Sequence, residues 1–148
     1  MKKIFIICTV RNATQQYLDK LYAYVENLET EGHEVHLPPR DTKQEDETGG
    51  YVICRTNMAG MMWADEVHVS YNEKSTGTHF DLGMAFMAHK KIHVFDGPEI
   101  DESVPKSFPK MMRHWENVCD TCWDGYSYVA HNFDKCPKCG EIFNEKNI

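Results

Sequence analysis

The chain has 148 residues, of which 41% are hydrophobic and 26% charged, a composition typical of a soluble globular protein with one domain, or one domain and a small appendage. The formal net charge of −7 argues against a general nucleic-acid-binding function, since such proteins usually carry a basic face. Every apolar run is far shorter than the roughly 18 residues of a membrane span, and polar Arg11 and Asn12 directly follow the first run, so we expect no membrane span, no signal peptide and a cytoplasmic location.

The first part of the chain alternates strand-like and helix-like segments. Residues Lys3 to Val10 form a continuous apolar run, typical of a strand that is buried on both faces of a parallel sheet. After a turn, Asn12 is predicted to cap an amphipathic helix that continues to about Glu31 and is ended by Gly32. A short second strand is predicted at 34–37, and we expect the two prolines after it to end it.

A polar, acidic segment at 40–50 is predicted to be a loop. It leaves the carboxyl end of the second strand, which is the edge where ligands bind in open α/β sheets. Arg40 and Asp41 are therefore candidates for substrate contacts. Residues 42–48 fit a plain solvated loop better than a binding segment.

The pattern continues with a helix at 51–64, a strand at 66–71, a helix that ends near His89 and a strand at 92–95. Four apolar side chains of the first of these helices are expected to be buried: Ile53, Met58, Met61 and Met62. The β-α-β-α-β-α-β alternation predicts a doubly wound parallel sheet of four to five strands, flavodoxin-like or Rossmann-like, with right-handed crossovers. We predict the strand order 2-1-3-4, which places the turns after the first and third strands on either side of one crevice.

The turn after the third strand has the sequence Ser75-Thr76-Gly77-Thr78-His79-Phe80-Asp81. A strand, a Ser/Gly/Thr turn and a helix start together form an anion site, because the free N–H groups of the first helical turn and the helix dipole point into it. Asp81 lies about one turn into this helix. It could simply stabilise the helix N-terminus, and the turn alone does not decide between that role and a chemical one.

The end of the chain contains a quartet of cysteines. Residues 97–109 resemble a linker and residues 110–117 a short helix, after which two Cys-x-x-Cys pairs follow with 13 residues between them: Cys119, Cys122, Cys136 and Cys139. Four thiolates in two such knuckles predict a structural Zn²⁺ site, with an iron–sulfur site as the minor alternative. We therefore divide the chain into an α/β domain at 1–112 and a zinc ribbon at 113–148, whose folding the metal would drive.

The zinc ribbon is a poor candidate for DNA binding, since residues 113–148 hold 4 basic and 6 acidic residues, giving 4 − 6 = −2. A structural, dimerising or lid function is favoured, with Trp115 among the aromatic residues that could pack on the main domain. The remaining cysteines, Cys8 and Cys54, are predicted to be inert core thiols.

Three segments resemble one known family. They are Ile-Cys-Thr-Val-Arg at 7–11, the helix from Asn57 to Ala-Asp at 64–65, and Ser-x-Gly-x-x-x-Asp-Leu-Gly-x-Ala at 75–85. The third is the most specific, because the family shows Ser-x-Gly-x-x-x-Glu-Leu-Gly-x-Ala. Residues 3 to about 95 thus resemble the nucleoside 2-deoxyribosyltransferase family, and most closely its branch of nucleoside 5′-monophosphate N-glycosidases. The resemblance does not cover the cysteine ribbon at the end of the chain.

By this resemblance, Asp81 stands where the family has a catalytic glutamate that attacks C1′ of the deoxyribose, expels the base and leaves a glycosyl-enzyme ester. A carboxylate suits this chemistry, since C1′ develops oxocarbenium character. Transfer to a second base gives a transferase, and transfer to water gives a hydrolase. Asn57 stands where many members carry an Asp that positions or protonates the base.

The resemblance also implies a binding site for the substrate's 5′-phosphate. Ser75 and the N–H groups near Gly77 and Thr78 would hold the phosphate, and Arg11 would add a charge-assisted contact. A homo-oligomer is expected by resemblance only, because sites in this family are often completed by a neighbouring subunit.

The chain departs from the family at both catalytic positions. Asp81 is one methylene shorter than Glu, and misplacing a reacting group by about 1 Å can cost roughly 100-fold in rate. Asn57 cannot protonate a leaving group, a loss of roughly 10²–10⁴-fold. The leading hypothesis is an N-glycosidic hydrolase or transferase acting on a nucleoside or deoxynucleoside 5′-monophosphate. The alternatives are a nucleotide-binding sensor without turnover and an adaptor whose zinc ribbon recruits a partner.

Overall fold

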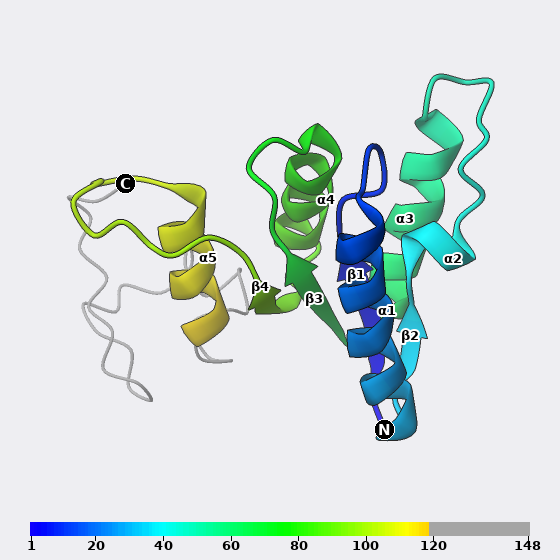
Figure 1. Ribbon diagram of the computed structural model, residues 1–148, viewed down its shortest axis with the longest axis horizontal. Helices are drawn as coiled ribbons and strands as arrows, with labels where there is room; N and C mark the ends of the chain where they lie inside the picture. The colour runs from blue at the N-terminus through cyan, green and yellow to red at the C-terminus, as the bar shows by residue number, and fades with distance from the viewer. Residues whose placement is uncertain (119–148) are drawn as a thin grey trace, which may run out of the picture.

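The computed structural model describes residues 1–118, which form an open four-stranded parallel sheet with helices on both faces (Figure 1). The strands are β1 Lys3–Ile7, β2 Glu34–His36, β3 Glu66–Ser70 and β4 Lys91–Asp96. Their order in the sheet is β2-β1-β3-β4, and every neighbouring pair is parallel. The predicted doubly wound α/β fold and the predicted strand order are both confirmed.

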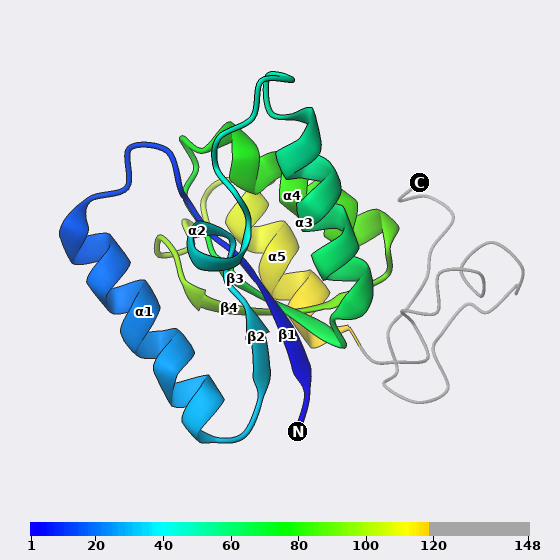
Figure 2. The ribbon, with the colours of Figure 1, turned by 90° about the vertical axis from the view of Figure 1, so that its right-hand side faces the viewer.

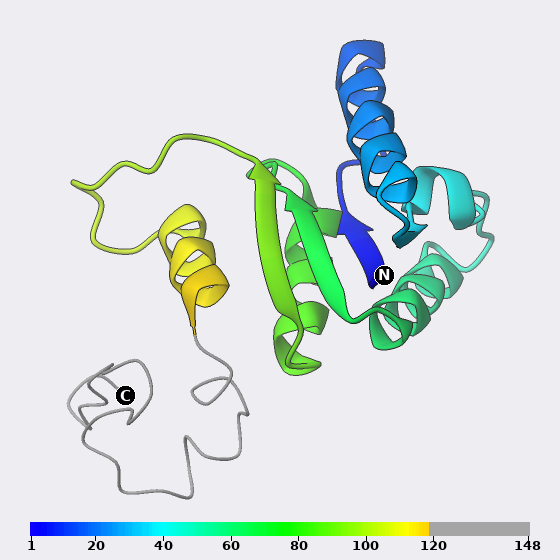
Figure 3. The same cartoon turned by 90° about the horizontal axis from the view of Figure 1, so that it is seen from below.

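Within the described residues, five helices connect or follow the strands: α1 Gln15–Thr30, α2 Pro38–Asp41, α3 Tyr51–Trp63, α4 Thr76–Met87 and α5 Phe108–Asn117. Helix α1 covers one face of the sheet, and α3 and α4 lie side by side on the other (Figure 2). Helix α5 packs along β4 at the edge of the sheet, on the side of α4 (Figure 3). No helix within residues 1–118 is both long enough and apolar enough to cross a membrane.

The central strand β1 explains the two-sided core, because successive side chains of a strand point to opposite faces. Ile4 and Ile6 are buried under α1, while Phe5 and Ile7 are buried under α3 and α4. An unbroken apolar run is therefore what this position in the sheet requires, as the sequence pattern predicted.

Hydrogen bonds join the carboxyl ends of three strands. The Thr9 N–H donates to Tyr17 Oη at 3.1 Å, and the Tyr17 hydroxyl donates to Ser70 Oγ at 3.0 Å. Ser70 Oγ in turn donates to Asp96 Oδ2 at 2.9 Å. This line runs from the end of β1 through α1 to β3 and β4, and it fixes the edge of the sheet at which the candidate site lies.

The structure corrects the predicted start of the first helix. The N-cap is Thr14, whose Oγ1 accepts a hydrogen bond from the Tyr17 N–H at 3.2 Å, and not Asn12. Asn12 instead has a φ of 59°, in the left-handed region that Asn tolerates better than most residues. It reverses the chain between β1 and α1.

Helix α2 was not predicted. The two prolines after β2 begin this helix, since the first turn of a helix has no intrahelical use for the missing N–H groups. The loop that follows is also more ordered than predicted. The Asp46 carboxylate accepts from the N–H groups of Val52 at 2.9 Å and Ile53 at 3.1 Å, so it caps α3, which has Gly50 at its N-cap position.

The buried side of α3 also differs from the prediction. Met61 is buried, but Met58 and Met62 are 45% and 63% exposed, and the other buried residues of the helix are Asn57 and Gly60. A Cβ at Gly60 would lie 2.9 Å from the Phe5 ring, so the glycine allows α3 to lie close against β1. This close approach brings Asn57 over the sheet.

Helix α5 begins earlier than predicted and belongs to the core. Met112 and Trp115 are buried against the sheet, and the Trp115 indole N–H donates to the Lys90 carbonyl at 3.0 Å. Trp115 thus packs on the main domain, as predicted, and the predicted boundary at 112/113 falls inside this helix. The four cysteines of the predicted zinc ribbon lie outside the described residues, so that prediction remains untested.

Candidate active site

The candidate site lies at the carboxyl edge of the sheet, where the turns after β1 and β3 meet α3 and α4. Asp81 projects from the second turn of α4 and is only 7% exposed. Its carboxylate accepts a hydrogen bond from another helix, since Asn57 Nδ2 of α3 donates to Asp81 Oδ2 at 3.4 Å. The fold therefore brings together the two residues to which the resemblance assigns the chemistry.

Burial changes the acidity of the groups around Asp81. It raises the pKa of Asp81 from 3.8 to about 6, and the hydrogen bond from Asn57 offsets part of that increase. Burial also raises the pKa of Cys8 to about 12, with a smaller contribution from the negative charge of Asp81. Cys8 is therefore a neutral thiol at physiological pH, in agreement with the inert role predicted for it.

Two further polar residues, which no sequence pattern indicated, hold Asn57 on the side away from Asp81 through its Oδ1. Thr42 Oγ1 donates to Asn57 Oδ1 at 3.2 Å, and His36 Nε2 lies 3.0 Å from the same hydroxyl oxygen. Thr42 is buried, at 4% exposure, although it was assigned to a solvated loop. No motif marks this pair, because it depends on how α2 turns the chain back toward α3.

The N-cap residue of α4 satisfies one of the free N–H groups at the start of this helix. Ser75 Oγ accepts from the Thr78 N–H at 3.2 Å, so this side chain completes the helix end. The N–H groups of Thr76 and Gly77 have no partner within residues 1–118, as expected for a first helical turn. The hydroxyls of Thr9 and Thr78 are buried without a hydrogen-bond partner in the same part of the chain. Thr76 and Gly77 are exposed, so their N–H groups are available to a ligand at this edge.

His79 holds the turn in place. Its Nδ1 lies 2.8 Å from the Ser75 carbonyl oxygen, and its Nε2 lies 3.1 Å from Tyr71 Oη. The ring also packs edge-on against Tyr71 and Phe108. Both ring nitrogens are thus engaged within the protein.

The three charged residues predicted to contact substrate differ in their surroundings. Arg11 lies exposed in the turn after β1, and its side chain makes no hydrogen bond or ion pair within residues 1–118. Arg40 is paired with Glu29 at 2.9 Å and donates to Asp41 at 2.8 Å. Asp41 also accepts from the Leu37 N–H at 2.8 Å, so a substrate contact by Arg40 or Asp41 would have to replace bonds that hold α2.

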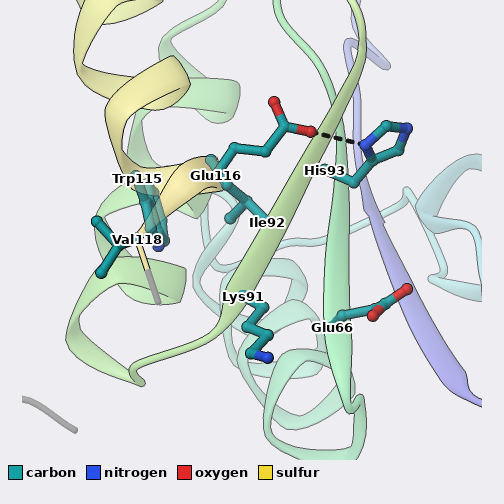
Figure 4. A pocket seen from close by; sticks show the side chains of 7 residues that line it. All are labelled: Glu66, Lys91, Ile92, His93, Trp115, Glu116 and Val118. Atoms are coloured by element: carbon teal, nitrogen blue, oxygen red, sulfur yellow. Dashed lines mark hydrogen bonds and ion pairs between the residues drawn. The ribbon is translucent and has the colours of Figure 1, made fainter. Parts of the chain in front are cut away.

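A cavity of about 140 Å³ lies elsewhere on the molecule (Figure 4). It is lined by Glu66, Lys91, Ile92, His93, Trp115, Glu116 and Val118. His93 Nδ1 and Glu116 Oε1 lie 2.7 Å apart beside it. Glu66 and Lys91 begin β3 and β4, so this cavity is at the amino edge of the sheet, away from Asp81.

The fold and the position of the site define an open, doubly wound α/β protein whose candidate functional groups lie at the carboxyl edge of a parallel sheet. Solved structures share this fold, and two of them have related descriptions. One is a 2-deoxyribosyltransferase from Bacillus psychrosaccharolyticus, 19% identical with a TM-score of 0.54, the match covering 81% of this chain and 94% of that one. The other is the CMP N-glycosidase BcmB of Clostridium botulinum, 17% identical with a TM-score of 0.52 over 78% and 84% of the two chains. No protein-family model and no curated protein matches the sequence.

Proposed function

We propose that this protein is an N-glycosidic enzyme that acts on a nucleoside or deoxynucleoside 5′-monophosphate. The observation that carries the proposal is the buried Asp81 carboxylate, held against Asn57 beside a helix N-terminus with unpaired N–H groups. The two proteins of similar fold are described as a 2-deoxyribosyltransferase and a CMP N-glycosidase, which supports the same kind of chemistry here.

In the proposed reaction, ionised Asp81 attacks C1′ of the sugar. The C1′–N bond breaks, its electron pair leaves with the base, and an ester forms between C1′ and the carboxylate. Water or a second base then attacks C1′ and releases the carboxylate. Asn57 can donate a hydrogen bond but not a proton, so the proton taken up by the base comes from solvent.

The same edge offers contacts to a phosphate. The N–H groups of Thr76 and Gly77 lie at the positive end of the α4 dipole, and Arg11 adds a full positive charge from the turn across the edge. The Ser75 and Thr78 hydroxyls complete the proposed set. We expect a nucleoside monophosphate to be preferred over the free nucleoside for this reason.

Two further proposals concern the whole chain. Cys119, Cys122, Cys136 and Cys139 bind one structural Zn²⁺, as their spacing indicates. The protein is a homo-oligomer, which is supported by the apolar side chains exposed on α3 and α4.

The direct test is to incubate the protein with a panel of ribo- and deoxynucleoside 5′-monophosphates and to measure free base by chromatography. We expect release from at least one of them, abolished by Asp81→Ala and increasing with pH through about 6 as Asp81 ionises. If no substrate releases base, or if Asp81→Ala is as active as the wild type, the enzymatic proposal fails. A nucleotide that raises the melting temperature and stays intact would instead favour the non-catalytic sensor.

A further inference from the structure

A line of hydrogen bonds from β2 ends on the Asp81 carboxylate. His36 Nε2 lies 3.0 Å from Thr42 Oγ1, Thr42 Oγ1 donates to Asn57 Oδ1 at 3.2 Å, and Asn57 Nδ2 donates to Asp81 Oδ2 at 3.4 Å. The four side chains come from β2, from the residue after α2, from α3 and from α4. Successive members are 6, 15 and 24 residues apart in sequence, and the fold brings them together.

The donors and acceptors in this line can be arranged in only one direction when Asp81 is ionised. A carboxylate only accepts, so Asn57 must turn its NH₂ group toward Asp81 and its Oδ1 toward Thr42. The single hydroxyl hydrogen of Thr42 then goes to Asn57 Oδ1. Because that hydrogen is used, the contact with His36 requires a hydrogen on Nε2, which fixes the tautomer of the ring.

Packing holds the line in place. Thr42 is 4% exposed, and Asn57 and Asp81 are each 7% exposed, so water does not compete freely for their hydrogen bonds. The His36 ring stacks on Phe5 with 5.1 Å between centroids. Burial lowers the pKa of His36, which favours its neutral form.

We propose that Thr42, held in turn by His36, is a positioning residue of the active site that fixes the Asn57 amide with its NH₂ group toward Asp81. Its catalytic meaning rests on the proposed function, but the positioning is a property of the folded protein alone. Without the Thr42 hydroxyl, Asn57 Oδ1 would be buried with no partner, and the amide could rotate to present an oxygen to the carboxylate.

Near neutral pH, few other charged groups can alter the pKa of Asp81 and so obscure a change caused by Thr42. Within residues 1–118, the titratable groups that face Asp81 are the thiols of Cys8, directly after β1, and Cys54 on α3. The pKa of each is raised, so both stay neutral. His36 faces Asp41, whose pKa is lowered, and the guanidinium of Arg40, and both of these remain charged. A change in the pKa of Asp81 therefore measures a change in the hydrogen bonds that run from His36 through Thr42 and Asn57.

The test compares Thr42→Val, which removes the hydroxyl at nearly constant volume, with Thr42→Ser, which restores it. Thr56→Val is the matched control, since Thr56 precedes Asn57 on α3 but donates to its own helix, to the Val52 carbonyl at 3.0 Å. The readout is the Asp81 carboxyl titration by ¹³C NMR, assigned with Asp81→Asn. It needs no substrate and no turnover.

We expect Thr42→Val to raise the pKa of Asp81 by roughly 0.5–1, the equivalent of one lost hydrogen bond, and to move the pH profile of base release in the same direction. Base release near pH 6 should fall about two- to sixfold, because the ionised fraction of Asp81 would fall from about one half to between one quarter and one tenth. Thr42→Ser and Thr56→Val should both resemble the wild type. His36→Phe, which retains the stack on Phe5, should produce a smaller increase in the same direction.

The outcomes separate this inference from the proposed function. If Thr42→Val leaves the Asp81 titration equal to that of Thr56→Val, the positioning role is wrong even when the wild type releases base. If the pKa shifts as expected but no nucleotide is cleaved, the positioning stands and the enzymatic function fails. Should Thr42→Val not fold, a folded His36→Phe with an unchanged Asp81 titration would overturn the proposal.

Discussion

At the scale of single residues, the burial of Asp81 has a consequence for stability. A carboxyl with a pKa of 3.8 when unfolded and about 6 when folded binds its proton more tightly in the folded state. Ionisation therefore destabilises the fold, with the full effect above pH 6 and none below the unfolded pKa of 3.8. The pKa difference corresponds to about 2–3 kcal/mol for this buried group.

Asp81→Asn is accordingly predicted to increase the free energy of unfolding by about 2–3 kcal/mol at pH 8, because the amide has no charge to bury. The increase should shrink toward zero near pH 4. Urea denaturation of both proteins at the two pH values provides the measurement. An equal increase at both pH values would show that Asp81 is not a destabilising buried charge.

The residues of the candidate site were only partly predictable. Asp81 and Asn57 could be placed together, because a motif marked each of them and both follow from the order of strands and helices. Thr42 and His36 could not, since a single threonine in a polar segment and a single histidine in a short strand carry no periodic signal. Their roles depend on a side-chain arrangement that forms only when α2 and α3 pack on the sheet.

At the scale of elements, apolar runs and breakers were sufficient to locate all four strands and the order in which they pair. The same reasoning failed at α2 and on α3. Proline pairs can begin a helix as well as end a strand, and an all-apolar helix has no polar face to show which side is buried. Met58 and Met62 were misassigned for this second reason.

Replacing two helical glycines by alanine should change the stability of the protein in opposite directions. A Cβ at Gly60 would lie 2.9 Å from the Phe5 ring, whereas a Cβ at Gly83 of α4 would meet nothing within 4 Å. Gly60→Ala should therefore destabilise the protein by about 1–3 kcal/mol through overpacking, despite the better helix propensity of alanine. Gly83→Ala should stabilise it by about 0.5–1 kcal/mol. Thermal denaturation of the two variants checks this, and a stabilising Gly60→Ala would mean that α3 does not lie so close to β1.

At the scale of the whole molecule, α3 and α4 are apolar on nearly all sides, and Arg55 and Asp81 are their only acidic or basic side chains apart from His79. Large apolar side chains of both helices are exposed: Tyr51, Val52, Met58, Met62, Trp63, Phe80, Phe86 and Met87. A helix that is apolar all round is normally covered, which is why we place the contact between copies of this chain here.

We predict that light scattering will show a dimer or larger assembly, and that Met62→Glu combined with Met87→Glu will weaken it, because burying a carboxylate without a partner is costly. Tyr22→Glu is the control, since Tyr22 is 42% exposed on α1, on the opposite face of the sheet. If the wild type is a monomer, the proposed homo-oligomer is wrong. If the double variant assembles like the wild type, the exposed faces of α3 and α4 do not form the contact between copies.

The cysteine quartet gives a prediction about metal content. Four thiolates saturate a tetrahedral Zn²⁺, so the purified chain should contain one zinc per molecule, and Cys136→Ser should reduce that amount strongly. Cys54→Ser should retain the zinc, because Cys54 lies on α3 within the α/β domain and has no part in the proposed site. Elemental analysis after dialysis measures both. Iron with visible absorption would point to an iron–sulfur centre, and equal zinc in all three proteins would show that the metal is held elsewhere.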